Sequence, residues 1–196
     1  ALRAPALGGV GCWQVEQRAG KAYVTGKRMA GPKSGSANAG IPESIVIVGG
    51  GTAGQAAAET LRREGYAGPV TMLSSDTHLP CDRPNLSKNF LAGTAPAEWL
   101  AEFYQEQNID VRLATQVVGI DPAQRQLQLA DGSRLAYGAL LLATGAEPVR
   151  LDLPGAHLPH VHVLRTQADG EALATAAEGA KRAVVIGASF IGLEVA

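Results

Sequence analysis

The sequence predicts an α/β fold built around two units of strand, glycine-rich turn and helix. Two short apolar runs, residues 45–48 and 183–187, each lead into such a turn and then into helix-like sequence. Further apolar runs at 70–73 and 139–145 have the length and composition of strands buried on both faces of a parallel sheet. The 24 glycines and the 5% aromatic content suit tight turns and close backbone packing better than a β-sandwich.

Composition and charge exclude several classes of protein. The 196 residues leave room for one large domain or two small ones, and 46% hydrophobic residues are enough for a core. The net charge of -1 argues against nucleic-acid binding, which needs a basic surface. No apolar run approaches the ~20 residues that a membrane span requires. We therefore expect no nucleic-acid partner and no membrane span.

The cysteines and histidines predict no metal site. Cys12 and Cys81 belong to no C-x-x-C pair, which favours a reduced, cytoplasmic protein and packing roles for both thiols. The histidines of "HLPHVH", residues 157–162, have poor ligand spacing and no accompanying carboxylate or cysteine. Solvated or structural histidines are the expected interpretation.

The elements can be placed in order along the chain. Residues 1–28 contain a β-hairpin around the turn-like "RAGK", and 29–44 are a linker rich in glycine, serine, alanine and proline. After the strand at 45–48, a helix is expected over 53–64, with Gly65 as its stop. The later elements are a strand at 70–73, a helix at 99–108, a strand at 110–113, a hairpin around Asp131-Gly132, a strand at 139–145, a helix at 166–177 and a strand at 183–187.

The first glycine turn has the pattern of a dinucleotide site. Gly49 permits the tight turn, Gly51 leaves room for a pyrophosphate, and Gly54 lets the helix pack close to the strand. Free N–H groups at the helix start can then bind the phosphates. Asp76 follows the second strand, where an acid would bind ribose hydroxyls, with Ser75 beside it. The alternative is a glycine turn that only packs a helix on a sheet.

Four motifs give the chain a family resemblance that runs from about Ile45 to its end. "DRPNLSK" (82–88), "LLLATGAEP" (140–148) and "GASFIGLEVA" (187–196) follow the first glycine turn in a specific order. In this the chain resembles flavoprotein reductases of the ferredoxin-reductase type, which include apoptosis-inducing-factor-like proteins, within the FAD-dependent pyridine nucleotide-disulfide oxidoreductases. The resemblance implies a Rossmann-like FAD-binding domain over 45–150 and the beginning of a Rossmann-like NAD(P)H-binding domain over 151–196.

The resemblance also implies the residues that contact FAD. The pyrophosphate would lie on the first turn, the ribose on Asp76 and Ser75, and the flavin near Arg83 and Lys88, whose cation would stabilise charge on reduction. The FAD-binding residues implied are Gly49, Gly51, Thr52, Ala53, Gly54, Ser75, Asp76, Arg83, Lys88, Val117, Thr144 and Gly145. The alternative for the two cations is an ordinary place on the surface.

The second turn is implied to bind NAD(P)H, with one departure from the family pattern. Ser189 stands at the middle glycine position and adds a small side chain where the pyrophosphate would approach. The residues implied here are Gly187, Ser189, Phe190, Ile191 and Gly192. We expect Glu194 to pair with Lys88 across the flavin, and these two are the candidate catalytic residues. The alternative for Glu194 is an exposed helix carboxylate.

The implied function is hydride transfer from NAD(P)H to FAD and electron transfer to an iron–sulfur acceptor, either a ferredoxin or a fused Rieske domain. Residues 1–28 resemble the tail of a Rieske-like domain, or are an ordinary β extension. The chain lacks an initial methionine and stops just after the second glycine turn, where the next helix begins. We therefore expect a fragment that is a poor NAD(P)H reductase on its own. A non-enzymatic nucleotide-binding fragment and a simple NAD-dependent dehydrogenase remain alternatives, and NADH versus NADPH stays open.

Overall fold

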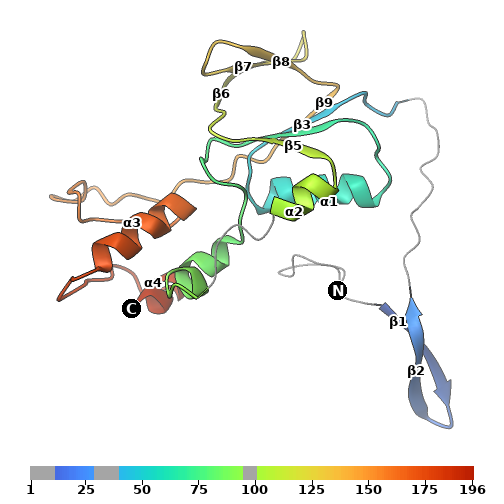
Figure 1. Ribbon diagram of the computed structural model, residues 1–196, viewed down its shortest axis with the longest axis horizontal. Helices are drawn as coiled ribbons and strands as arrows, with labels where there is room; N and C mark the ends of the chain where they lie inside the picture. Colours follow the sequence, from blue (N-terminus) through green and yellow to red (C-terminus); the bar gives the residue numbers. More distant parts are fainter. Residues whose placement is uncertain (1–11, 29–39, 95–100) are drawn as a thin grey trace.

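The computed structural model describes residues 12–28, 40–94 and 101–196, and Figure 1 shows how their elements are arranged. The start of the 1–28 segment, most of the predicted linker, and the first two positions of the predicted 99–108 helix lie outside these residues. That helix, α2, is described over Ala101–Glu106.

A four-stranded parallel sheet forms the centre of the molecule. Its strands are β3 (Ile45–Val48), β4 (Val70–Leu73), β5 (Ile109–Arg112) and β9 (Ala139–Leu142). The spatial order is β5-β4-β3-β9, and every neighbouring pair runs parallel. The chain order therefore reverses at β3, and in such sheets ligands bind at the carboxyl ends of the strands beside this reversal. The predicted α/β class is confirmed.

Helices cover one face of this sheet. The helix α1 (Thr52–Arg63) and α2 lie on the same side in Figure 1. Ile47 and Met72 point from the sheet into a buried cluster that contains Ala58 of α1 and Tyr104 of α2. This packing holds α1 against the sheet, so that the helix begins close to the carboxyl end of β3.

A small antiparallel sheet covers the other face. Its strands are β6 (Val117–Asp121), β7 (Gln126–Leu129) and β8 (Arg134–Ala136), in the order β6-β7-β8. Leu127 and Leu129 pack against Val46, Val48 and Leu73 of the parallel sheet. Their alternation with exposed glutamine is the two-residue period of a strand with one buried face. The hairpin around Asp131-Gly132 is confirmed, whereas β6 was not predicted.

The end of α1 is held by one arginine. Gly65 has a φ of 89° and donates its N–H to the Arg62 carbonyl, as expected for a helix stop. The Arg62 guanidinium donates to the carbonyls of Tyr66, Gly68, Gln107 and Asn108, each at 2.8 Å. It therefore joins the helix end to the loop before β4 and to the loop before β5.

The N-terminal hairpin is present as predicted. Strands β1 (Cys12–Arg18) and β2 (Lys21–Arg28) pair antiparallel, and Ala19 and Gly20 in the turn have φ values of 49° and 74°. Positive φ at both central residues is the geometry that matches the twist of a two-residue hairpin. Its kinship with a Rieske-like domain stays a prediction.

The remaining elements form a separate lobe in Figure 1. It contains α3 (Gln167–Ala177) and α4 (Phe190–Val195), which lie beside a short 3-10 turn, η1 (Arg83–Asn85), and a π-helical turn, η2 (Leu86–Phe90). Thr166 caps α3 by accepting from the Asp169 N–H, while the Asp169 carboxylate accepts from the Thr166 N–H. This reciprocal capping box fixes the start of the predicted 166–177 helix.

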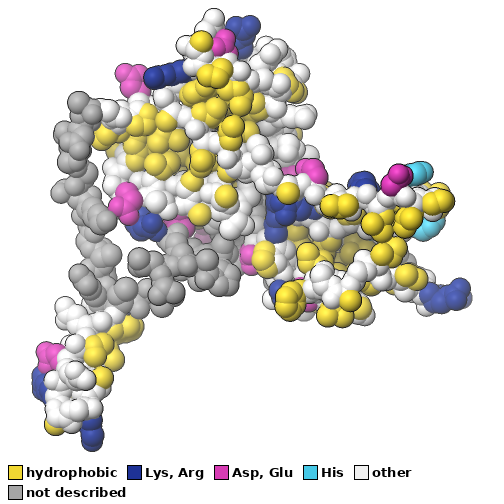
Figure 2. Space-filling view, turned by 180° about the vertical axis from the view of Figure 1, so that it is seen from behind, with side chains coloured by type: hydrophobic (Ala, Val, Ile, Leu, Met, Phe, Trp, Pro, Cys, Tyr) yellow, Lys and Arg dark blue, Asp and Glu magenta, His cyan; other side chains and the backbone are white. Residues whose placement is uncertain are grey.

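The predicted strand at 183–187 is not formed. Within the part of the chain that the structure describes, this run pairs with no other strand, and Val184 and Ile186 are 87% and 74% exposed. A strand needs a neighbour to receive its backbone hydrogen bonds, and apolar pattern alone does not supply one. Figure 2 shows apolar side chains gathered on the lobe that contains this run.

Candidate functional site

The first glycine turn is packed tightly at two positions and open at the third. A Cβ on Gly49 would lie 2.1 Å from the Ala143 carbonyl oxygen, and one on Gly54 would lie 2.1 Å from the Gly49 carbonyl oxygen. Gly49 also has a φ of 120°, which side chains disfavour. A Cβ on Gly51 would meet nothing closer than the Arg83 guanidinium at 3.9 Å. The turn is thus locked in place while Gly51 faces free space.

The acid expected to bind ribose follows β4, beside this turn. A Cβ on Gly50 would lie 2.8 Å from Ser74 Oγ, and that hydroxyl accepts the Asp76 N–H at 3.2 Å. Ser74 is buried, whereas Ser75 and Asp76 reach the surface of the site. The buried hydroxyl therefore fixes the backbone that presents Asp76.

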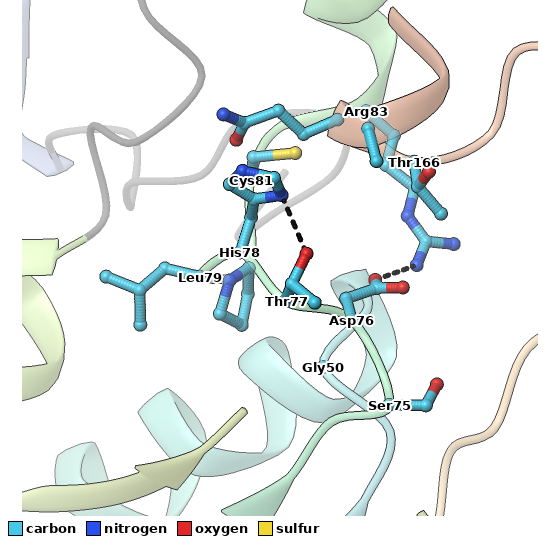
Figure 3. Close-up of a pocket in the computed structure, with 12 residues that line it drawn as sticks. Gly50, Ser75, Asp76, Thr77, His78, Leu79, Cys81, Arg83 and Thr166 are labelled. Carbon is cyan, nitrogen blue, oxygen red and sulfur yellow. Dashed lines mark hydrogen bonds and ion pairs between the residues drawn. The ribbon is translucent and has the colours of Figure 1, made fainter. Parts of the chain in front are cut away.

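Arg83 faces Asp76 across the mouth of the turn. Its Nη2 lies 3.6 Å from Asp76 Oδ2, and Figure 3 shows the two side chains pointing toward each other. Gly50, Asp76, Cys81, Arg83 and Thr166 line a cavity of about 190 Å³ at this point. A planar cation beside an open glycine suits a phosphate ligand, because guanidinium can offer paired donors.

Cys81 lines the same cavity as a partly buried free thiol. Burial raises the pKa of the Cys81 thiol above its usual range, and the Arg83 cation offsets this only in part. A thiol that stays protonated is a poor nucleophile. The predicted packing role is therefore consistent with its surroundings.

The segment that enters β6 lies beside the acid. Ala114 donates its N–H to the Asp76 carbonyl at 2.9 Å, and Thr115 donates to the Ser74 carbonyl at 2.8 Å. Val117 begins β6 two residues later, and its side chain packs with the core beneath the small sheet. Val117 therefore follows directly after the segment that hydrogen-bonds to the backbone of Ser74 and Asp76, and its adenine contact stays a prediction.

Thr144 and Gly145 follow β9 and lie next to Arg165, which was not among the predicted site residues. Gly145 has a φ of 75°, and a Cβ there would lie 3.1 Å from Arg165 Nη2. The Arg165 N–H donates to the Asp169 carboxylate at 3.0 Å, so the α3 cap orients this residue. The sequence does carry a signal for this residue, because Arg165 directly precedes Thr166, the residue that caps α3.

The second glycine turn repeats the local geometry of the first. Gly187 has a φ of 111°, and a Cβ on Gly192 would lie 2.3 Å from the Gly187 carbonyl oxygen. Ser189 is the N-cap of α4, and its hydroxyl makes no capping hydrogen bond. Phe190 and Ile191 are largely exposed on the first turn of that helix. The turn is formed although the strand before it is not.

The two candidate catalytic residues are in contact. Lys88 Nζ lies 3.1 Å from Glu194 Oε1, which joins η2 to α4. Ser87, the residue before Lys88, donates its hydroxyl to Glu194 Oε2 at 2.5 Å. These hydrogen bonds, from Ser87 first and Lys88 second, lower the pKa of the Glu194 carboxyl. Ser87 was not among the predicted site residues.

The geometry therefore has two parts: an open glycine position beside the Asp76–Arg83 ion pair, and an ion pair between Lys88 and Glu194. Across residues 12–28, 40–94 and 101–196, no three His, Cys, Asp or Glu side chains are grouped to hold a metal ion. Among the same residues, no helix is both long and apolar enough to cross a bilayer.

Comparison with known proteins assigns the family. The sequence model of the pyridine nucleotide-disulphide oxidoreductases matches residues 43–196. The chain belongs to this family. In this family member, the match starts just before β3 and includes both glycine turns, so the resemblance inferred from the motifs is confirmed.

Named relatives of this oxidoreductase-family chain are ferredoxin reductases and an apoptosis-inducing factor. It is 41% identical over 157 residues to the ferredoxin–NAD(+) reductase component of the biphenyl dioxygenase system of Paraburkholderia xenovorans, covering 79% of this chain and 38% of that protein. It is 40% identical over 174 residues to apoptosis-inducing factor 3 of Homo sapiens, covering 87% of this chain and 28% of that protein.

Solved structures agree with the sequence relatives. A ferredoxin reductase from Rhodopseudomonas palustris superimposes with a TM-score of 0.72 at 40% identity, over 78% of this chain and 39% of that one. A covalent putidaredoxin reductase–putidaredoxin complex gives a TM-score of 0.67 at 34% identity, over 78% of this chain and 38% of the matched one. The chain thus spans less than two fifths of the length of each of these relatives.

Proposed function

We propose that the protein to which this chain belongs is an FAD-dependent NAD(P)H oxidoreductase that delivers electrons to an iron–sulfur partner. The observation that carries the proposal is the open Gly51 position facing Arg83, next to Asp76, in a family of pyridine nucleotide oxidoreductases. Bound FAD would supply the chemistry, since a flavin accepts a hydride from a nicotinamide and returns electrons singly.

The residues around the first turn fit the adenosine and pyrophosphate parts of FAD. Backbone N–H groups at the start of α1 would bind the pyrophosphate, and Gly51 leaves the approach open. Arg83 would contact the phosphates from the other side, and Asp76 with Ser75 would accept the ribose hydroxyls. Val117 would lie against the adenine, and Thr144 and Gly145 against the cofactor beyond β9.

The Lys88–Glu194 pair would lie at the flavin. Its ammonium would stabilise negative charge on the reduced ring, and its carboxylate would hold that ammonium in place. We propose that the Gly187 turn, with Ser189 at its helix start, binds the pyrophosphate of NAD(P)H.

The domain limits and partners are part of the same proposal. Residues 45–150 would form most of the FAD domain and 151–196 the start of the NAD(P)H domain. Relatives named ferredoxin–NAD(+) reductases favour an iron–sulfur acceptor, either a separate ferredoxin or a Rieske domain fused before residue 29. The free Cys81 thiol agrees with work in the reducing cytoplasm.

Absorption spectroscopy of the longer protein that carries this chain tests the proposal. We expect visible flavin bands that are lost when NADH or NADPH is added without oxygen and restored by an oxidised ferredoxin. A colourless protein that binds NAD would instead identify a dehydrogenase. A colourless protein that binds neither cofactor would contradict both and leave a non-enzymatic fragment.

A further inference from the structure

We infer that Ser87 is a positioning residue that holds the Glu194 carboxylate in contact with Lys88. The inference rests on the proposed function of that ion pair and adds a third member to it. Ser87 is only 5% exposed, although its side chain is polar. A buried hydroxyl needs a hydrogen-bond partner, and this one reaches across from η2 to α4 to find it.

The two carboxylate oxygens of Glu194 are divided between two donors. Ser87 Oγ donates to Oε2 at 2.5 Å, and Lys88 Nζ donates to Oε1 at 3.1 Å. Two contacts from adjacent residues fix both the position and the rotation of the carboxylate, whereas one contact would leave rotation free. The Lys88 side chain is 50% exposed, so its ion pair alone would be weakened by solvent.

A second acceptor, the Pro84 carbonyl, lies near both donors. The Pro84 carbonyl lies 3.4 Å from Ser87 Oγ and 3.3 Å from Lys88 Nζ, so both donors have the same alternative. The Lys88 ammonium has three donors and contacts Pro84 and Glu194 together, whereas Ser87 has one hydroxyl proton, which the nearer, ionised carboxylate attracts more strongly. A displaced Glu194 would leave Ser87 with the longer Pro84 contact alone and would remove the Lys88 contact with α4. Ser87 therefore supports the arrangement in which Lys88 faces Glu194.

The test measures Glu194 directly and the flavin separately. Glutamate labelled with carbon-13 gives a carboxyl signal for each residue, and Glu194→Gln identifies the signal of Glu194. In the flavin-loaded longer protein, Ser87→Ala should move the Glu194 titration to higher pH, because a donor to the charged form is lost. Ser87→Thr keeps the hydroxyl and should restore the original titration. An unchanged titration in Ser87→Ala overturns the inference.

The flavin midpoint potential distinguishes this inference from the proposed function. Ser87→Ala should shift the potential to a less negative value, since Lys88 is then less neutralised, and Glu194→Gln should shift it in the same direction. The double variant should shift no further than Glu194→Gln alone. If Glu194→Gln leaves the potential unchanged, the ion pair does not act on the flavin, while the titration still decides the role of Ser87. If Ser87→Ala does not fold, Ser87→Cys provides a weaker donor of similar size and should move the titration the same way.

Discussion

Arg83 and Asp76 form an ion pair, 3.6 Å between Nη2 and Oδ2, at the mouth of the first glycine turn. Both side chains are partly exposed, at 26% and 34%, so solvent weakens the attraction between them. The Arg83 guanidinium can therefore exchange Asp76 for a phosphate at small cost. In the proposed FAD site, this pair would provide a cation for the pyrophosphate and, beside it, an acid for the ribose.

This relationship predicts which part of a nucleotide each residue recognises. Arg83→Ala should weaken ADP binding about tenfold or more, because a charge-assisted hydrogen bond contributes about 1.5–3 kcal/mol. Binding of adenosine, which has no phosphate, should change little. Calorimetric titration with both compounds measures the difference. Arg150→Ala removes an exposed arginine elsewhere and serves as the control. Equal losses for ADP and adenosine would refute the phosphate contact.

Substitution of Gly49 and of Gly51 in the first glycine turn should have different effects, the first on stability and the second on FAD binding. Gly49→Ala should destabilise the fold by several kcal/mol, because its Cβ would lie 2.1 Å from a backbone oxygen at a φ of 120°. Gly51→Ala has space for its Cβ, so the free energy of unfolding should change by less than about 1 kcal/mol, as measured by thermal denaturation. The Gly51→Ala protein should nevertheless bind FAD poorly, since the methyl group occupies the pyrophosphate approach. Normal FAD affinity in this folded variant would contradict the proposed site.

Removal of the Arg62 side chain should cost stability without touching the cofactor site. Arg62→Ala leaves four carbonyls without their donor, three of them in part-buried bonds, and should lower the free energy of unfolding by about 2–3 kcal/mol. Urea denaturation measures this value. Arg63→Ala, an exposed neighbour on the same helix, should change it by less than about 0.5 kcal/mol. Similar losses for both arginines would show that the carbonyl contacts contribute little.

The Cys81 thiol should react slowly and in a pH-dependent way. Burial raises its pKa, so less thiolate is present at neutral pH than for a free cysteine, and the alkylation rate should keep rising above the usual pKa range of a thiol. The measurement uses a Cys12→Ser background, in which Cys81 is the one remaining cysteine. Bound ADP should slow the reaction further, because Cys81 lines the same cavity as Asp76 and Arg83. If bound ADP does not slow the alkylation of Cys81, the nucleotide does not bind in this cavity.

The parts of the fold that depend on local pattern were predictable from sequence. The strand at 45–48, the glycine turn and the start of α1 each follow from a few adjacent residues, and so does the hairpin turn at Ala19-Gly20. The contact between Lys88 and Glu194 was expected only because the motifs resembled a known family. Its third member, Ser87, was missed, because a serine near a lysine carries no sequence signal of a distant carboxylate.

Other features depend on contacts that sequence does not display. The turns η1 and η2 have no regular apolar period, and the helix geometry is broken at Lys88. Strand β6 has a glycine in its centre and mostly exposed residues, so its alternation is weak. The run at 183–187 has a strong strand pattern but lacks a partner among the described residues, which is why the prediction there was wrong.

That unpaired run has a practical consequence for any work with this chain. Three consecutive apolar side chains of this run are exposed, those of Val184, Val185 and Ile186. Within the described ranges, their backbone N–H and C=O groups pair with no neighbouring strand. Such a segment is a template for edge-to-edge association with another molecule, which natural proteins suppress with charges or covering elements. Aggregation of the purified chain should therefore begin at this run, and a charged residue in place of Val184 should slow it.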